Sequence, residues 1–199
     1  MPRTEAANQA IRQAQQQKIL EAARRVFARK GEAATMADVS AEAKVSQGLP
    51  YRYFTSKEAL FYQLLEQATQ ATPTAARQLL EMQGTPGDRL YWAITQMVES
   101  RREQPEIFQL FDQVLSNQMI PDDLRELVQR NVRTAEDVLR QLIMEGQIAG
   151  EVAAGDPDQM VRAILVYLDG LTRSISLYGL EEFRRHFPDP KIVLRLLKP

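Results

Sequence analysis

The sequence predicts an all-α protein with a short N-terminal unit of three helices, residues 1–60, and a longer helical domain, residues 61–199. Apolar residues recur at helical spacing through most of the chain, and proline and glycine separate the helical stretches. No segment alternates apolar and polar residues for long enough to suggest a sheet. The apolar content of 44% indicates a globular chain with ample core.

The chain opens with residues 1–17, which are rich in Ala, Gln and Arg. They are expected to form a flexible basic arm or the frayed start of a helix. A helix with one apolar face follows, because Ile19, Val26 and Phe27 fall at helical spacing. Gly31 marks the end of this helix.

Two short helices joined by a tight turn are predicted next, within residues 35–54. Thr35 is expected to cap the first of them, with Asp38 as a weaker version of the capping-box acid. Met36 and Val39 give this helix its apolar face. The result is a helix-turn-helix pattern.

The second short helix is predicted over residues 46–54, after a turn at residues 44–45, and Ser46 is expected to cap it. Leu49 and Tyr53 lie four residues apart, so they are expected to share a face and pack inward. The residues left to point outward are Gln47, Gly48, Tyr51 and Arg52.

This second helix lies in a stretch without acids, since no carboxylate occurs between Glu42 and Glu58. A short, acid-free, aromatic-rich helix suits the major groove of DNA, because phosphates repel carboxylates and base edges need donors and acceptors. Pro50 would sit in its opening turn, where proline is tolerated. Thr55 and Glu58 form a capping box for the next helix, and Lys57 in its first turn would meet a phosphate.

These residues resemble, in order and spacing, the DNA-binding region of the TetR family of bacterial transcriptional regulators. Lys44 stands where the family usually has glycine, so the turn would need a left-handed non-glycine residue. Pro50 replaces a more ordinary helix former. The matching pieces cover roughly the first third of the chain and comprise the run from Ile19 to Gly31, Thr35-Met36-x-Asp38-Val39, Val45-Ser46-x-Gly48, Tyr51-x-Tyr53-Phe54 and Ser56-Lys57-Glu58-x-Leu60.

The resemblance implies a set of residues that contact DNA. Gln47, Tyr51 and Arg52 would touch bases or phosphates, against the alternative of an ordinary solvated helix face. For the remaining side chains, phosphate contact is weighed against simple capping or packing. Gly48 would let the backbone approach the double helix closely. The full set is Thr35, Ser46, Gln47, Gly48, Pro50, Tyr51, Arg52, Tyr53 and Lys57.

Beyond residue 60 the sequence predicts one helix after another. Pro73 is expected to end or kink the helix that starts near Ser56, and Asp88 to cap the helix after a loop at residues 84–87. Further helices are predicted to open at Pro105, to run from Pro121 to Gly146, to open at Asp156, and to cover residues 180–186 and 190–198.

The segment from Met160 to Leu168 is apolar on nearly all sides, which predicts burial on two faces. The second face would lie against another copy of the chain, and Gly170 and Ser174 would allow close helix approach. A central helix of a monomeric bundle is the alternative. Two-fold symmetry also suits paired half-sites about 34 Å apart, so we expect a homodimer on a palindromic DNA operator.

The resemblance also implies that residues 61–199 dimerise and bind a small-molecule effector that weakens operator binding. The predicted function is a sequence-specific regulator of transcription, most simply a repressor that the effector releases. The alternative is a helical protein–protein interaction module that kept the fold but lost operator binding. Candidates to line the effector cavity, against the alternative of ordinary core positions, are Trp92, Gln96, Phe108, Phe111, Met119, Met144 and Tyr167.

Composition narrows the function classes. Residues 1–60 hold 10 Lys and Arg against 6 Asp and Glu, whereas residues 61–199 hold 15 against 20, as expected if only one end meets nucleic acid. With one histidine and no cysteine, we expect no enzyme activity, no cofactor and no bound metal. No apolar run approaches a membrane span and no signal-peptide core is evident, so we expect a cytoplasmic protein without membrane contact.

Overall fold

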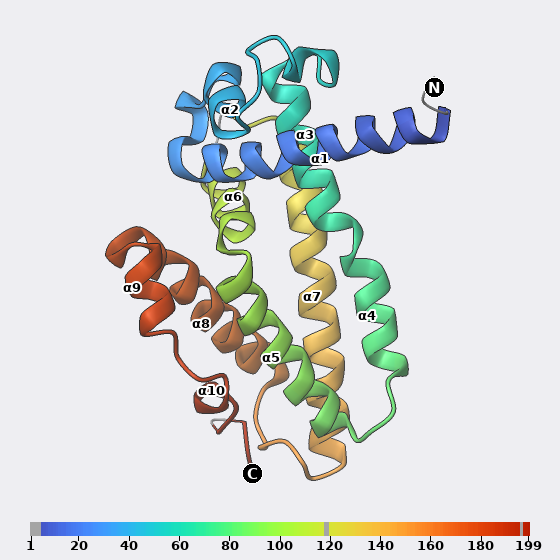
Figure 1. Ribbon diagram of the computed structural model, residues 1–199. Coiled ribbons are helices and arrows are strands. Elements are labelled where there is room, and N and C mark those ends of the chain that lie inside the picture. Colours follow the sequence, from blue (N-terminus) through green and yellow to red (C-terminus); the bar gives the residue numbers. More distant parts are fainter. Residues whose placement is uncertain (1–4, 118–119, 196) are drawn as a thin grey trace.

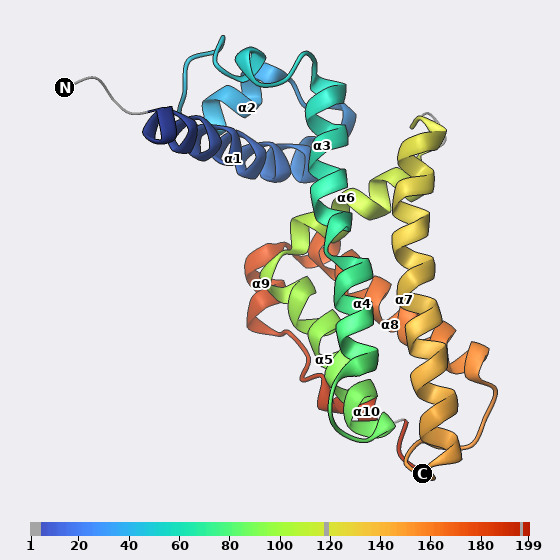
Figure 2. The same ribbon diagram turned by 90° about the vertical axis from the view of Figure 1, so that its right-hand side faces the viewer.

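The computed structural model describes residues 5–117, 120–195 and 197–199, and within these residues every regular element is a helix (Figure 1). The all-α prediction is confirmed. Helix α1 lies across one end of the molecule, while α7 and the consecutive α3 and α4 run along its length (Figures 1 and 2). The α-helices are α1 (Glu5–Lys30), α2 (Met36–Glu42), α3 (Lys57–Gln70), α4 (Thr72–Glu81), α5 (Pro86–Glu103), α6 (Pro105–Ser116), α7 (Asp122–Ile148), α8 (Pro157–Tyr178), α9 (Leu180–Arg185) and α10 (Lys191–Arg195), and the 3-10 helices are η1 (Gly31–Ala33) and η2 (Pro50–Arg52).

Helix α1 is continuous, so residues 5–17 are helical and do not form a flexible arm. Ala, Gln and Arg have high helix propensity, which favours this extension of the apolar half. The first half of α1 projects beyond the other helices (Figure 1), whereas the second half buries Ile19 and Val26. Residues 1–4 of the expected arm lie outside the described residues.

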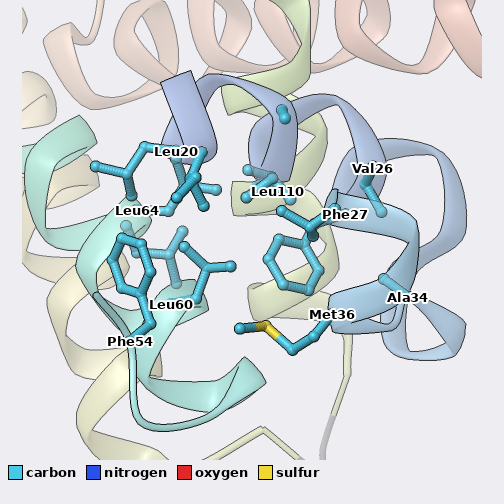
Figure 3. Packing of buried hydrophobic residues seen from close by; sticks show 14 of the residues in the cluster. Leu20, Val26, Phe27, Ala34, Met36, Phe54, Leu60, Leu64 and Leu110 are labelled. Atoms are coloured by element: carbon cyan, nitrogen blue, oxygen red, sulfur yellow. The ribbon is translucent and has the colours of Figure 1, made fainter. Parts of the chain in front are cut away.

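Buried apolar side chains form two cores. The first core lies beneath α1 and is shown in Figure 3, and the second core fills the other end of the molecule. Members of the first core include Leu20, Val26, Phe27, Met36, Phe54, Leu60, Leu64, Leu110 and Leu124. Members of the second core include Leu79, Leu90, Ile94, Val98, Leu139, Leu142, Val161, Ile164 and Leu168.

The packing of the first core crosses the expected domain boundary at residue 60. Leu110 from α6 lies among the side chains of α1 and α3 (Figure 3), and Leu124 from the start of α7 joins the same core. The later part of α7 supplies Leu139 and Leu142 to the second core. One helix therefore links the two cores, and the N-terminal unit is completed by helices that come much later in the chain.

Prolines mark the helix starts largely as predicted. Helix α3 ends at Gln70 and α4 begins at Thr72, beside Pro73. Helix α6 opens at Pro105, and the side chain of Asp156 caps α8. Helices α9 and α10 are shorter than the predicted ranges 180–186 and 190–198.

The start of α5 differs from the prediction, because Thr85 caps this helix in place of Asp88. The Thr85 hydroxyl accepts a hydrogen bond from the Asp88 N–H at 3.2 Å, and the Asp88 carboxylate accepts one from the Thr85 N–H at 3.3 Å. Pro86 then occupies the first helical turn, where its missing N–H leaves no backbone bond unmade. The helix therefore begins earlier than the sequence pattern indicated.

Helix α8 is buried on one side only within the single chain. Val161, Ile164 and Leu168 pack into the second core, whereas Val166 is 66% exposed and Leu177 is 74% exposed. The two exposed residues share the opposite face, since they lie three helical turns apart. Burial on two faces therefore does not occur within one chain, and burial against a second copy stays a prediction.

Candidate nucleic-acid interface

The first short helix, α2, begins at the predicted reciprocal cap. The Thr35 hydroxyl accepts a hydrogen bond from the Asp38 N–H at 3.1 Å, and the Asp38 carboxylate accepts one from the Thr35 N–H at 3.0 Å. The other carboxylate oxygen lies 2.6 Å from Lys30 Nζ. Hydrogen bonds from Lys30 and then from Thr35 lower the pKa of Asp38 to about 2.

Two ion pairs hold α2 against α1. Arg25 Nε and Arg29 Nη2 each donate to Glu42 at 2.8 Å, one to each carboxylate oxygen. The hydrogen bond from Arg29, followed by that from Arg25, lowers the pKa of Glu42. The last acid before the carboxylate-free stretch is therefore paired with two cations and repels an incoming phosphate less than a free carboxylate would.

The turn after α2 depends on Lys44, which has a left-handed backbone with φ of 53°. Its N–H donates to the Ala41 carbonyl at 3.1 Å, and the Val45 N–H donates to the Ser40 carbonyl at 3.0 Å. The predicted left-handed non-glycine residue is confirmed, at a cost of about 1–2 kcal/mol relative to an ordinary helical conformation. The side chain is exposed, so the turn adds a cation to this surface.

The segment 46–54 forms turns and the short η2, and not the predicted second α-helix. The Leu49 N–H donates to the Ser46 carbonyl at 3.0 Å, and the Tyr53 N–H donates to the Pro50 carbonyl at 3.0 Å. Because Pro50 has no N–H, it cannot donate the α-helical hydrogen bond to the Ser46 carbonyl. The segment instead forms hydrogen bonds between residues three apart, as in a 3-10 helix. Ser46 therefore has no α-helix to cap, contrary to the prediction.

The side chains predicted to point outward do so. Gln47, Gly48 and Arg52 are exposed, and Tyr51 is 58% exposed. A Cβ added at Gly48 would meet no atom within 4 Å, so the surface is open at that position. We call Lys44, Gln47, Gly48, Tyr51 and Arg52 the turn surface. It offers two cations, an amide and a phenol hydroxyl, all able to donate to phosphate oxygens or to acceptors on base edges.

Two other predicted contact residues lie beneath the turn surface. Tyr53 is half-buried and packs with Leu49 against the first core, as the four-residue spacing indicated. Pro50 is buried, so its ring supports the segment from within and is not part of the exposed surface. The segment is thus held by apolar packing on one side and open to solvent on the other.

The cap of α3 is Ser56, one residue later than predicted. Ser56 has an extended backbone and its hydroxyl accepts a hydrogen bond from the Ala59 N–H at 3.1 Å, so Thr55 is left outside the helix start. The backbone N–H of Glu58, followed by the Ser56 hydroxyl, lowers the pKa of Glu58. Lys57 Nζ donates to the Glu32 carbonyl at 2.9 Å, so this lysine braces η1 and is only half-exposed.

The residues expected to line an effector cavity are not brought together. Trp92 is 44% exposed and Met144 is 48% exposed, Gln96 also faces solvent, and Met119 lies outside the described residues. The neighbouring positions Ile94 and Ile143 fill the second core instead, because periodicity alone does not say which face of a helix meets the bundle. The Tyr167 hydroxyl is buried without a hydrogen-bond partner, and Phe108 and Phe111 line a groove at the junction of the two cores.

Residues 19–64 match the sequence model of a family described as bacterial regulatory proteins, tetR family. The match spans the second half of α1, the capped α2, the turn surface and the start of α3. This stretch of the chain is therefore similar to the N-terminal DNA-binding region of TetR-family regulators. No match is found among curated protein sequences.

The TetR-type fold extends over nearly the whole chain. The MbdR regulator from Azoarcus sp. CIB is 21% identical with a TM-score of 0.78, over 92% of this chain and 97% of that one. A TetR-family transcriptional regulator from Agrobacterium tumefaciens is 18% identical with a TM-score of 0.73, over 94% and 99%. FadR from Bacillus subtilis, solved in complex with stearoyl-CoA, is 19% identical with a TM-score of 0.62, over 92% and 97%. At these identities the likeness establishes the TetR fold alone.

Among residues 5–117, 120–195 and 197–199, no three His, Asp or Glu side chains gather as metal ligands would. In the same residues, no helix combines the length and hydrophobicity that a membrane crossing requires.

Proposed function

We propose that the protein is a sequence-specific DNA-binding regulator of transcription, which acts as a cytoplasmic homodimer and represses until a small-molecule effector releases it. The observation that carries the proposal is the turn surface, an exposed and carboxylate-free set of donors held rigidly on the first core. In this proposal phosphate contacts fix the register on DNA, and Gln47, Tyr51 and Arg52 reach the bases.

Homodimerisation is supported by the outer face of α8. Val166 and Leu177 are large apolar side chains that stay mostly exposed in one chain. Burying them against a second copy is favourable by about 25 cal/mol for each Å² of apolar surface removed from water. A two-fold dimer also presents two turn surfaces to a palindromic operator.

Control by a small molecule is supported by the fold. FadR from Bacillus subtilis, which shares that fold, is known in complex with stearoyl-CoA. A ligand that favours a dimer geometry unsuited to the operator would release DNA, by as much as its affinity differs between the two geometries. The proposal includes no catalytic role, no cofactor and no membrane contact.

The test of DNA binding starts from an operator selected out of a random DNA pool by the intact protein. Replacing Tyr51→Ala should weaken binding to that operator about ten-fold or more in a gel-shift titration, because one good base contact is worth about 1–3 kcal/mol. The matched control is Tyr91→Ala, which removes another exposed tyrosine, 43% accessible, from α5. Equal affinities of the two variants would exclude the turn surface as the contact, and failure to enrich any short palindrome would favour the protein–protein interaction module.

A salt titration of the same complex tests the phosphate contacts. Affinity should fall steeply with salt concentration, and Arg52→Ala should lower the slope of log affinity against log salt by about one. A flat response in the unmodified protein would contradict phosphate-based binding.

The dimer is tested by sedimentation of matched variants. Val166→Asp should convert the dimer to monomer at micromolar concentration, because a carboxylate would be buried unpaired in the interface. Ile148→Asp is the control, since Ile148 is an exposed apolar residue, 88% accessible, at the end of a different helix, α7. Dimers of equal strength in both variants would show that the outer face of α8 is not the interface.

A further inference from the structure

A groove of about 460 Å³ lies at the junction between the two cores, in the size range of small-molecule sites. Its walls come from α1, from the end of α3 with the start of α4, and from the end of α5 with the start of α6, which lie close together in Figure 2. Two helix breaks face it, at Ala71 between α3 and α4 and at Gln104 between α5 and α6. The groove therefore lies where the direction of the chain changes twice.

The chemistry of the groove suits an uncharged amphipathic molecule. Two aromatic rings and several aliphatic side chains form its apolar lining, namely Leu20, Leu64, Ala68, Ile107, Phe108 and Phe111. The edge carries neutral hydrogen-bonding groups, namely Gln17, Gln67, Thr72, Ser100 and Gln104. The charged groups on the edge are Glu21 and Arg24, which have opposite signs, so the groove offers no net charge to a ligand.

The contacts across the groove are loose on one side and firm on the other. Arg24 Nη1 lies 3.5 Å from Gln104 Oε1, and Arg24 Nε lies 4.0 Å from Glu106 without a hydrogen bond. Toward the end of α1, Gln113 Nε2 donates to the Ala28 carbonyl at 3.1 Å in a half-buried contact. The polar contacts of Arg24 across the groove are therefore weak, whereas the Gln113–Ala28 contact and the apolar packing of Leu110 against α1 hold the far end of the contact in place.

We propose that this groove binds uncharged, ring-bearing amphipathic molecules with hydroxyl or carbonyl groups on one edge. Bound there, such a molecule stacks on Phe108 and Phe111, hydrogen-bonds the amides of the edge and moves Arg24 away from Gln104. Helix α1 then tilts about the Gln113–Ala28 contact. The site borders the first core and includes Phe108 and Phe111, two of the residues expected to line the effector cavity.

The tilt reaches the turn surface through α1 itself. Arg25 and Arg29 follow Arg24 along the same helix, and both are paired with Glu42 of α2 at 2.8 Å. Movement of α1 therefore carries α2 and the turn surface with it, which changes the spacing of two turn surfaces in a dimer. This regulatory step depends on the proposed function, whereas binding in the groove does not.

The test uses the full chain and the neutral fluorescent probe N-phenyl-1-naphthylamine, whose emission rises in an apolar site. The unmodified protein should bind the probe with saturation at micromolar concentration. Ala71→Trp, which fills the groove from an exposed position, should weaken probe binding at least ten-fold. Ala149→Trp makes the same substitution at an exposed alanine at the end of α7 and should leave binding unchanged.

A second variant that fills the groove, Gln67→Trp, is included in case Ala71→Trp fails to fold. Circular dichroism checks that both variants are folded. Absence of saturable probe binding in the unmodified protein, or equal binding by Ala71→Trp, Gln67→Trp and Ala149→Trp, would overturn the site.

The tilt of α1 is tested by measuring operator affinity in the presence of saturating probe. Operator affinity of the unmodified protein should fall at least five-fold when the probe is added, whereas that of Ala71→Trp should stay constant. If the probe changes the operator affinity of neither protein, the tilt is overturned. A protein that binds the probe but no operator refutes the proposed function and leaves the site standing.

Discussion

The two cores support surfaces of opposite character. Above the first core, the exposed turn surface is polar and positive, and ion pairs of Glu42 with Arg25 and Arg29 fix the helices beneath it. Above the second core, the outer face of α8 exposes Val166 and Leu177. Both cores are built from the same kinds of aliphatic and aromatic residue.

In the proposed function, the partner of each surface is decided by the side chains that the core beneath it leaves exposed, and not by those that the core buries. A surface of donors without carboxylates attracts a polyanion, because its charge is not cancelled nearby. An exposed apolar helix face is stabilised by an apolar partner, for which a second copy of the chain is the simplest source. In the proposed function, one helical fold presents the DNA contacts above the first core and the dimer contacts above the second.

The largest expected effect tests whether the two cores are independent. Leu60→Ala removes a fully buried side chain of the first core, so the free energy of unfolding should fall by about 2–5 kcal/mol. Because α7 packs in both cores, the second core should unfold in the same transition. The fluorescence of Trp92, the single tryptophan, follows the second core, and far-UV circular dichroism follows the whole chain.

Coincident shifts of both signals in a denaturant titration would show one cooperative unit. If the Trp92 transition stayed in place while the circular dichroism transition split, the cores would unfold separately. The two cores would then belong to two domains that unfold independently.

A smaller effect is expected at the turn that begins the turn surface. Lys44→Gly should raise the free energy of unfolding by about 1 kcal/mol, because glycine adopts the left-handed backbone without the clash of a Cβ. The same variant should bind operator DNA more weakly, since an exposed cation is lost. Lys44→Gln loses the charge but keeps an ordinary side chain in the left-handed backbone, so it separates the effect of charge from the effect of conformation. Weaker folding of Lys44→Gly would contradict the strain at this position.

The smallest expected effect is a change in acid stability at the cap of α2. The folded-state pKa of Asp38 is lowered from 3.8 to about 2, so its stabilising effect is complete above about pH 4 and is lost as pH falls toward 2. Asp38→Asn should therefore flatten the decline in stability across this pH range, as measured by urea titrations at several pH values. Asp123→Asn, at an exposed position in the first turn of α7, is the control. A decline as steep as in the unmodified protein would show that the Lys30–Asp38 contact does not form in solution.

The sequence determined the features that depend on neighbouring residues. The reciprocal cap at Thr35, the proline start at Pro105 and the left-handed Lys44 are set by local backbone chemistry. The caps expected at Thr55 and Asp88 fall instead on Ser56 and Thr85. The outward direction of Gln47, Tyr51 and Arg52 also follows from local spacing, even though the segment folds as turns and not as an α-helix.

Tertiary structure decided the features that depend on residues far apart in the chain. Only the packed structure shows that Leu110 and Leu124 complete the first core, and that Trp92 and Met144 face solvent while Phe108 and Phe111 line the junction groove. Periodicity identifies an apolar helix face but not its neighbour, because the choice among possible neighbours is made by the shape and volume of all the helices together.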